Sequence, residues 1–332
     1  MRTIDARRLP ARLSICMLLE DVNCWNMISV VDCSSWALYE GLPEGSGRSE
    51  KQWLISEDGT VGLFKYPKID PVSQRNTFEH VSEHLACRLG GLLGVKTARV
   101  DIASYEGRIG SISYLIVEDG EMLVEGLQFI LGKHPEYSAE SLQDSSTGEH
   151  YSIRHIFEAI DYGPFSEYWI RMLLFDFIIG NSDRHQSNWA YILRRPNREM
   201  MEFDIEPCPL YDNGSSLCCY VREDQLHDYL GNDTMKLGSL VDTRSRSIVR
   251  IDPRDKKRPR HAEVVRFLLA NYPATRPIAD SFLERLSQSA VCSLVDAYQD
   301  DLVSPERRRL LVRFLLEKAR ILKGLVMECE HE

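Results

Sequence analysis

The sequence predicts an α+β fold of two lobes, in which a small β-rich lobe precedes a larger helical one. Short apolar runs broken by turn residues occupy the chain up to about residue 120, and amphipathic patterns with helical spacing follow. A chain of 332 residues can bury two such lobes but not many domains. We therefore expect a β-rich N-lobe over residues 1–120 and a helical C-lobe over residues 121–332.

The expected N-lobe holds two pairs of strands around one helix. The turn EDGT, residues 57–60, separates the strand-like runs KQWLIS and VGLFKY. Apolar residues recur at helical spacing from 76 to 93, and Gly94 stands where that helix would end. The runs KTARVDIA and GSISYLIVE predict two further strands with a short turn between them.

The C-lobe patterns predict helices and one exposed loop. Five amphipathic runs carry the helical signal: IRHIFEAIDYG, FSEYWIRMLLFDFIIG, HAEVVRFLLANY, PIADSFLERLSQSAVCSLVDAY and SPERRRLLVRFLLEKARILKGLVM. In the last run, leucines and Phe314 recur at helical spacing, so we expect this helix to pack into the core rather than to bind a partner. The polar, Ser- and Glu-rich segment 138–150 predicts an exposed loop.

Composition and charge argue against several classes of protein. A formal net charge of -10 disfavours sequence-independent binding to nucleic acid, which needs a basic surface. The nine cysteines include no C-x-x-C pair and are odd in number, so we expect no zinc ribbon, no disulfide framework and a cytoplasmic protein. No stretch approaches the roughly 18 apolar residues of a membrane-spanning helix. The apolar run at 13–19 has the bare minimum length for a signal peptide, but it ends in Glu20-Asp21 and lacks a small-residue cleavage site, so we do not expect export.

The most informative stretch of the sequence is FIIGNSDRHQSNW, which begins at residue 177. Asp183 lies five residues before Asn188, the spacing by which a catalytic loop presents an Asp that orients an acceptor hydroxyl and an Asn that binds a metal. Phosphoryl transfer requires little beyond such positioning and one or two Mg²⁺ ions. His185 is a further catalytic candidate. The alternative for His185 and Arg184 is to brace the loop by hydrogen bonds.

A returning strand brings a second metal-binding candidate to this loop. The runs WAYILRR and MEFDIEPCPLY predict a β-hairpin, which carries Asp212 back beside Asn188. In Asp212-Asn213-Gly214 the carboxylate can bind a metal, and the glycine permits a sharp turn away from it. Each fragment alone is weak, because D-x-x-x-x-N is common by chance and Asp-Asn-Gly is typical of a turn. The combination predicts that Asn188 and Asp212 bind a metal beside Asp183.

The N-lobe supplies candidates for holding nucleotide phosphates. In VGLFKYP, alternation places Phe64 and Tyr66 on one face of a strand and Lys65 on the other, where its amine can reach phosphates. The following helix presents Glu79 and Glu83. Small residues on the face around Glu83 favour it as the ion-pair partner of Lys65. The alternative is that both glutamates are solvated.

A loop that contains Gly45, Ser46 and Gly47 precedes this strand. Successive backbone N–H groups in such a loop can surround an anion. The loop lacks the full pattern of a known phosphate-binding motif, and turn glycines without a ligand would look the same. Ser46 and Ser49 also suggest self-phosphorylation, because a phosphate in this loop would repel a nucleotide.

A basic segment follows the second metal-binding candidate. Residues 244–260 contain eight basic and two acidic side chains. One hypothesis is an anion site for a phosphorylated residue or an acidic substrate. The alternative, and the one favoured from the sequence, is a solvated loop that neutralises an acidic neighbour.

These motifs, in this order, resemble those of the HipA-type serine/threonine kinases of bacteria. The resemblance rests on GSGRSEKQWLI, LFKYPK, SEHLACRLGGLLGV, LLFDFIIGNSDRHQSNW and PLYDNGSSL, and it spans residues 45–217. It implies a bilobal protein-kinase-like fold with Asp183 as catalytic base and Lys65 on the ATP phosphates. It also implies that Asn188 and Asp212 bind Mg²⁺.

The same resemblance implies further contacts with the nucleotide. Val117 and Glu118 fall at the hinge after the last N-lobe strand, where such kinases bind adenine, and Tyr211 precedes the metal-binding Asp. The expected nucleotide-binding set is completed by Gly45, Ser46, Gly47, Lys65 and Glu83.

The resemblance predicts a kinase that uses ATP and Mg²⁺ to phosphorylate Ser or Thr hydroxyls of a protein, itself included. Lipid and small-molecule kinases share the catalytic signatures, and a catalytically silent nucleotide-binding scaffold is a third alternative. The residues ahead of Gly45 are too few for the extra N-terminal domain of the full-length toxins, so the chain resembles the compact members. An antitoxin-like or regulatory partner is therefore expected by analogy alone, and the protein substrate is unidentified.

Overall fold

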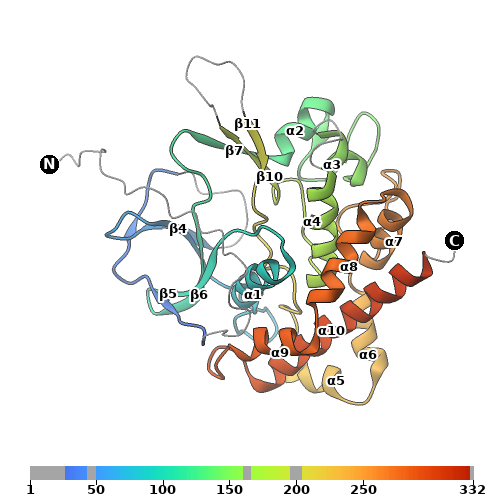
Figure 1. Cartoon of the computed structure of the whole chain (residues 1–332). Helices are drawn as coiled ribbons and strands as arrows, with labels where there is room; N and C mark the ends of the chain where they lie inside the picture. The colour runs from blue at the N-terminus through green and yellow to red at the C-terminus, as the bar shows by residue number, and fades with distance from the viewer. Residues whose placement is uncertain (1–26, 43–49, 160–165, 195–203, 330–332) are drawn as a thin grey trace.

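A computed structural model describes residues 27–42, 50–159, 166–194 and 204–329. The chain has the α+β arrangement that the sequence predicts. A β-sheet lies on one side of the molecule, most helices lie on the other, and helix α1 runs between them (Figure 1). No helix in the described ranges is both long and apolar enough to cross a membrane.

The larger sheet contains six strands in the order β1-β5-β6-β4-β3-β2. Their bounds are β1 Val31–Asp32, β2 Ala37–Leu38, β3 Lys51–Ile55, β4 Val61–Lys65, β5 Val100–Tyr105 and β6 Arg108–Tyr114. Strand β1 pairs with β5 in parallel, and the other pairs are antiparallel. The hairpin predicted at EDGT is confirmed as β3–β4, and Gly59 in its turn has φ +87°, a conformation open to glycine.

Alternation along β4 sends its side chains to two environments, as predicted. Phe64 is fully buried in a small core with Leu54 and Ile112. Lys65 lies on the opposite face, where its amine meets Asp212. The strand thus uses one face for packing and leaves the other for polar contacts with the second half of the chain.

Helix α1, Glu79–Leu93, connects the sheet to the helical part. It ends at Gly94, whose φ of 70° is left-handed, as the sequence predicts for a C-terminal cap. Its apolar face belongs to the same hydrophobic core as the C-terminal helices. The Nδ1 atom of His84 lies 2.7 Å from the hydroxyl of Tyr298, and this buried contact fixes the helix against the C-lobe.

The helical part is built around α4. Its helices are α2 Gly126–Lys133, α3 Ile153–Ala159, α4 Ser166–Ile179, α5 Leu226–Leu230, α6 Thr234–Gly238, α7 His261–Asn271, α8 Thr275–Arg285, α9 Gln288–Asp296 and α10 Pro305–Glu328. Helix α4 is apolar on nearly all sides, which is why it lies at the centre. The predicted core packing of α10 is confirmed, since Phe314 and its leucine neighbours are buried.

Two local predictions were wrong or incomplete. The run PIADSFLERLSQSAVCSLVDAY forms two helices, because the Ser287 hydroxyl accepts a hydrogen bond from the N–H of Ala290 and caps the start of α9. The apolar periodicity continues across this break and hides it. The segment 138–150, expected as an exposed loop, contains part of the hairpin β8 Tyr137–Ser138 and β9 Gln143–Asp144, and Asp144 is buried.

A second, three-stranded sheet lies beside α2 (Figure 1). It pairs β7 Glu121–Glu125 with β10 Ala190–Arg194, and β10 with β11 Asp204–Pro207, all antiparallel. The predicted hairpin after Asn188 is therefore confirmed as β10–β11. Beyond it, the N–H of Cys208 donates to the carbonyl of Ala190 at 3.0 Å. This pairing returns the chain to the loop between α4 and β10.

Candidate active site

Three segments that are distant in sequence meet around Asp212. The Nζ atom of Lys65, at the end of β4, lies 2.7 Å from Oδ1 of Asp212. The backbone N–H of Asn213 donates to Oε1 of Glu83, on α1, at 2.9 Å. The sheet, helix α1 and the loop after β11 are thus joined by charged groups at one point.

The charges at this point stabilise one another. Burial opposes the ammonium of Lys65, but the carboxylates of Asp212 and Glu83 outweigh it and raise the pKa of Lys65. The ammonium in turn holds the pKa of Asp212 at about 2. Lys65 and Asp212 are therefore both charged at neutral pH.

The predicted ion pair between Lys65 and Glu83 is not formed. Within the described residues, Lys65 pairs with Asp212 instead, and the buried carboxylate of Glu83 accepts the N–H of Asn213. The next residue, Gly214, packs so closely against α1 that a Cβ there would lie 3.0 Å from Oε2 of Glu83. Glu83 thus holds the Asp-Asn-Gly turn against α1 and acts on Lys65 only through its charge.

The backbone of Asp212 is strained. Its φ of +56° lies in the left-handed region, which a residue with a Cβ adopts at a cost. The neighbours on both sides are fixed, because the carbonyl of Tyr211 accepts from Arg184 at 2.9 Å and the N–H of Asn213 donates to Glu83. These bonds hold the carboxylate of Asp212 toward Lys65.

The loop between α4 and β10 presents the other predicted catalytic residues. The side-chain amide of Asn188 donates to the carbonyl of Asp183 at 2.8 Å, which leaves its amide oxygen for another ligand. Burial raises the pKa of Asp183, the charge of His185 opposes this, and the charge of Asp212 adds to it. The two loops are in contact, because the N–H of Ser182, next to Asp183, donates to the carbonyl of Ser215 at 3.2 Å. His185 stays within the loop, where its Nδ1 accepts from the N–H of Ser187 at 3.2 Å.

Arg184 forms hydrogen bonds to both the loop between α4 and β10 and the loop after β11. Its guanidinium is buried and forms an ion pair of 2.8 Å with Asp176, in the last turn of α4. It also donates to the carbonyls of Asn188 and Tyr211, at 2.7 and 2.9 Å, and to the Asn213 side chain at 2.5 Å. The bracing role considered for Arg184 is therefore the one that the geometry shows.

Asp176 is the residue that sequence reasoning missed. It is 2% exposed and carries a charge inside an apolar helix, where only a partner such as Arg184 makes burial tolerable. A single carboxylate within the otherwise apolar run LLFDFII was the available signal, because an unpaired charge there would destabilise the fold.

The oxygens of Asn188 and Asp212 suit a magnesium ion. Magnesium is commonly held by one or two protein oxygens together with substrate phosphates, so two side chains suffice. The Asp212 side chain is 44% exposed, and Lys65 bonds one of its oxygens, which leaves the other available. In the part of the chain that the structure describes, no group of three His, Cys, Asp or Glu side chains could hold a metal without such phosphates.

An apolar group lies beside these residues. Ala190, Ile192 and Cys208 are buried together, and Ile116, Val117 and Tyr211 pack against them. Of the two predicted hinge residues, Val117 belongs to this group and Glu118 does not. Glu118 is exposed, and its N–H donates to the carboxylate of Glu121 at 2.9 Å. The predicted phosphate-loop residues Gly45, Ser46 and Gly47, together with Ser49, lie outside the described residues.

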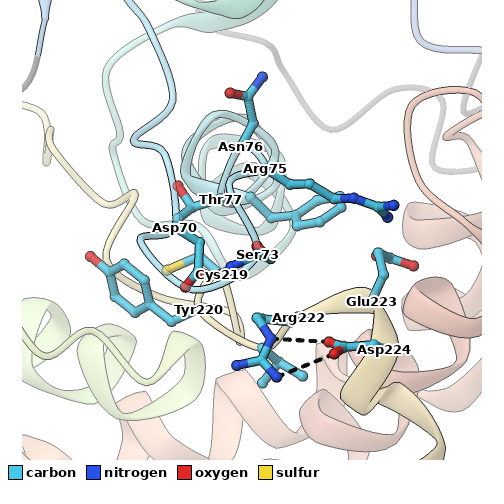
Figure 2. A pocket seen from close by; sticks show the side chains of 12 residues that line it. Asp70, Ser73, Arg75, Asn76, Thr77, Cys219, Tyr220, Arg222, Glu223 and Asp224 are labelled. Atoms are coloured by element: carbon cyan, nitrogen blue, oxygen red, sulfur yellow. Dashed lines mark hydrogen bonds and ion pairs between the residues drawn. The ribbon is translucent and has the colours of Figure 1, made fainter.

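Two cavities flank the charged group, and Lys65 and Asp212 line neither of them. One, of about 470 Å³, lies between the segment before α1 and the residues after Cys219. Figure 2 shows its polar walls, in which Arg222 is paired with Asp224. The other, of about 350 Å³, lies against the loop between α4 and β10 and against Ser215 and Ser216, which follow the Asp-Asn-Gly turn.

Solved kinase structures share this fold. The proinflammatory kinase CtkA of Helicobacter pylori matches with a TM-score of 0.72 and 19% sequence identity, over 90% of this chain and 99% of that chain. HipA of Shewanella oneidensis MR-1, in a complex with HipB and operator DNA, matches with a TM-score of 0.52 and 14% identity, over 89% and 68% of the two chains. No protein-family model matches the sequence, and no curated protein does. The chain therefore has the bilobal protein-kinase-like fold of the HipA-type kinases, as the resemblance of its motifs implied.

Proposed function

We propose that this chain is a kinase that transfers the γ-phosphate of ATP to Ser or Thr hydroxyls of proteins, itself included. The observation that carries the proposal is the ion pair of Lys65 with Asp212, beside Asp183 and Asn188. Phosphoryl transfer needs a cation on the phosphates, oxygen ligands for a metal and a carboxylate for the acceptor, and these residues can supply all three.

Lys65 and Asp212 exchange partners when the nucleotide binds. The ammonium of Lys65 would turn from the Asp212 carboxylate to phosphate oxygens, and the freed carboxylate and the amide oxygen of Asn188 would then be the residues that hold Mg²⁺. The bound ion supplies positive charge that offsets the charge of the phosphates. Glu83 keeps the turn that carries Asp212 in place during this exchange.

Asp183 orients the acceptor hydroxyl and accepts its proton. Burial raises the pKa of Asp183, which makes it a better proton acceptor than an exposed aspartate. The hydroxyl oxygen bonds to the γ-phosphorus as the bond to the bridging oxygen breaks, and ADP leaves with that oxygen. Arg184 holds the loop that carries Asp183 next to the turn that carries Asp212, because it donates to a carbonyl in each.

Adenine is proposed to bind against the apolar group beside the charged site. Val117 and Tyr211 offer it apolar surface, with Ile192 behind them. The backbone N–H of Glu118 donates to the carboxylate of Glu121, and this hydrogen bond must break before the N–H can bind the base. Gly45, Ser46 and Gly47 remain the predicted phosphate loop.

A regulatory partner belongs to the same proposal. The HipA neighbour is solved with HipB and operator DNA. An antitoxin-like protein that binds this chain would be its counterpart. The net charge of -10 argues that DNA would be contacted through such a partner rather than by this chain.

Transfer from labelled ATP tests the proposal and separates it from the alternatives. Purified protein is incubated with γ-labelled ATP and Mg²⁺, with no acceptor, with a protein lysate, or with inositol lipids and small alcohols. The proposal predicts label on Ser or Thr of protein. Label on lipid or small molecules alone would favour the second kind of kinase, and ATP binding without transfer would favour a scaffold.

A further inference from the structure

We infer that the protein segment phosphorylated by this chain carries an acidic or phosphorylated side chain, which binds in the cavity lined by Arg244 and Arg246. The inference rests on the proposed kinase function and specifies its substrate class. The shared chemistry is an anionic group, carboxylate or phosphate, close to the acceptor hydroxyl.

The cavity adjoins the place where the acceptor must lie. It has a volume of about 350 Å³ and is lined on one side by Ser182 and Ser215. Ser182 immediately precedes Asp183, and its N–H donates to the carbonyl of Ser215 at 3.2 Å. A side chain in this cavity therefore belongs to a segment that passes the catalytic loop.

The lining of the cavity is cationic. It includes Arg244 and Arg246 and no carboxylate side chain. Arg244 is exposed and forms no ion pair within the described residues, and Arg246 donates to the carbonyl of Arg258 at 2.8 Å. The carboxylates of Asp242 and Glu263 are instead paired with Arg260. Two guanidinium groups thus remain for an anion, which they bind well by paired hydrogen bonds.

A buried lysine lies behind the wall of the cavity. The Nζ atom of Lys318 donates to the hydroxyl of Ser245 at 2.9 Å, and Ser245 and Phe314 line the cavity. Lys318 is 1% exposed and has no carboxylate partner among the residues described. A buried ammonium with a neutral hydrogen-bond partner is costly, and an anion in the cavity would stabilise its charged form.

The positive charge of the basic segment 244–260 also affects the pKa of Asp183, the proposed catalytic base. The charge of Arg258 lowers the pKa of Asp183 against the effect of burial. The sequence alone favoured a solvated loop at 244–260. The placement of Arg244 and Arg246 at a cavity beside Ser182 supports the anion-site hypothesis instead.

Peptide substrates of matched sequence test the inference. Each peptide has one acceptor serine, flanked by Glu, phosphoserine, Ala or Lys, and the Glu and phosphoserine arms distinguish carboxylate from phosphate. Transfer by the 332-residue chain should show kcat/KM at least roughly tenfold higher for one anionic peptide than for the Ala peptide. In the double variant Arg244→Ala and Arg246→Ala this ratio should fall toward one through KM.

The matched control removes two charges from the same segment away from the cavity. The double variant Arg254→Ala and Lys257→Ala should keep the wild-type ratio. Binding of a fluorescent phosphoserine peptide without an acceptor hydroxyl gives a second readout, which should weaken roughly tenfold in the cavity variant only. Transfer to all peptides with equal kcat/KM, or equal loss in both double variants, would overturn the inference and leave the kinase proposal standing. Absence of transfer to any acceptor would instead overturn the kinase proposal and this inference with it.

Discussion

Lys65 and Asp212, 147 positions apart in the sequence, form an ion pair of 2.7 Å between strand β4 and the loop after β11. The pair places one cation and one carboxylate at the junction of sheet and helices. The ammonium of Lys65 also compensates the negative charge of Asp212 until another anion competes for it. The pair is therefore a resting contact that the nucleotide phosphates are expected to break.

Replacement of Lys65 by Met removes the cation proposed to hold the phosphates. The transfer rate should fall roughly 10²-fold or more, because that charge is not replaced in the transition state. The pKa of Asp212, now about 2, should rise toward 3.8, which carboxyl titration by NMR can follow. Lys96→Met, at an exposed lysine, is the control and should transfer normally. Wild-type transfer by Lys65→Met would exclude the role assigned to Lys65.

Replacement of Arg184 by Met leaves Asp176 buried without a partner. Loss of one member of such a pair lowers the free energy of unfolding by about 3–5 kcal/mol, so chemical denaturation should detect it easily. Arg171→Met, which removes a surface pair with Glu167 on the same helix, should change stability by less than about 1 kcal/mol. Equal effects of the two variants would show that the buried pair does not organise the site.

Replacement of Gly214 by Ala should displace the Asp-Asn-Gly turn, the proposed metal-binding turn, from α1. The added Cβ would lie 3.0 Å from Oε2 of Glu83, so the turn must shift by a few tenths of an ångström. We expect a clear loss of transfer rate with small loss of stability. Gly91→Ala, inside α1 with nothing within 4 Å of the new Cβ, should instead stabilise the protein by about 0.5–1 kcal/mol and transfer normally. A Gly214→Ala protein with full activity would show that the close packing is dispensable.

Lys318 makes stability depend on pH. Burial lowers its pKa from 10.5 to about 7, and the charge of Asp242 opposes this only in part. The unfolded chain therefore binds more protons than the folded one between about pH 7 and 10.5, so stability rises with pH across this window. Lys318→Met should be more stable than wild type below pH 7, and this advantage should shrink as pH rises. An advantage that is independent of pH in denaturation experiments would contradict the lowered pKa.

The sequence predicts those features that depend on short-range patterns. The β3–β4 hairpin follows from a turn with glycine at φ +87°, and α1 ends at Gly94 because a left-handed cap is needed there. The opposite faces of Phe64 and Lys65 follow from strand alternation. Each of these is settled by a few neighbouring residues.

The pairing of charged groups depends on distances that the sequence does not contain. Glu83 lies on the expected face of α1. The distance between the Asp-Asn-Gly turn and the helix decides whether its carboxylate binds Lys65 or the backbone of Asn213. Gly214 sets that distance, because a residue without a Cβ lets the turn approach the helix closely. The link of Arg184 to Asp176 likewise joins groups whose proximity arises only from the packing of α4 beneath the loops.

The most direct test of the account compares γ-phosphate transfer by the wild-type protein, by Asp183→Asn and by Asp212→Asn, each with Mg²⁺ and after chelation of the metal. Circular dichroism confirms that all three proteins are folded. We expect label on protein Ser or Thr with wild type and Mg²⁺, and transfer reduced by orders of magnitude in both variants and without metal. Transfer at the wild-type rate by either folded variant, or undiminished transfer after chelation, would contradict the proposed catalytic centre.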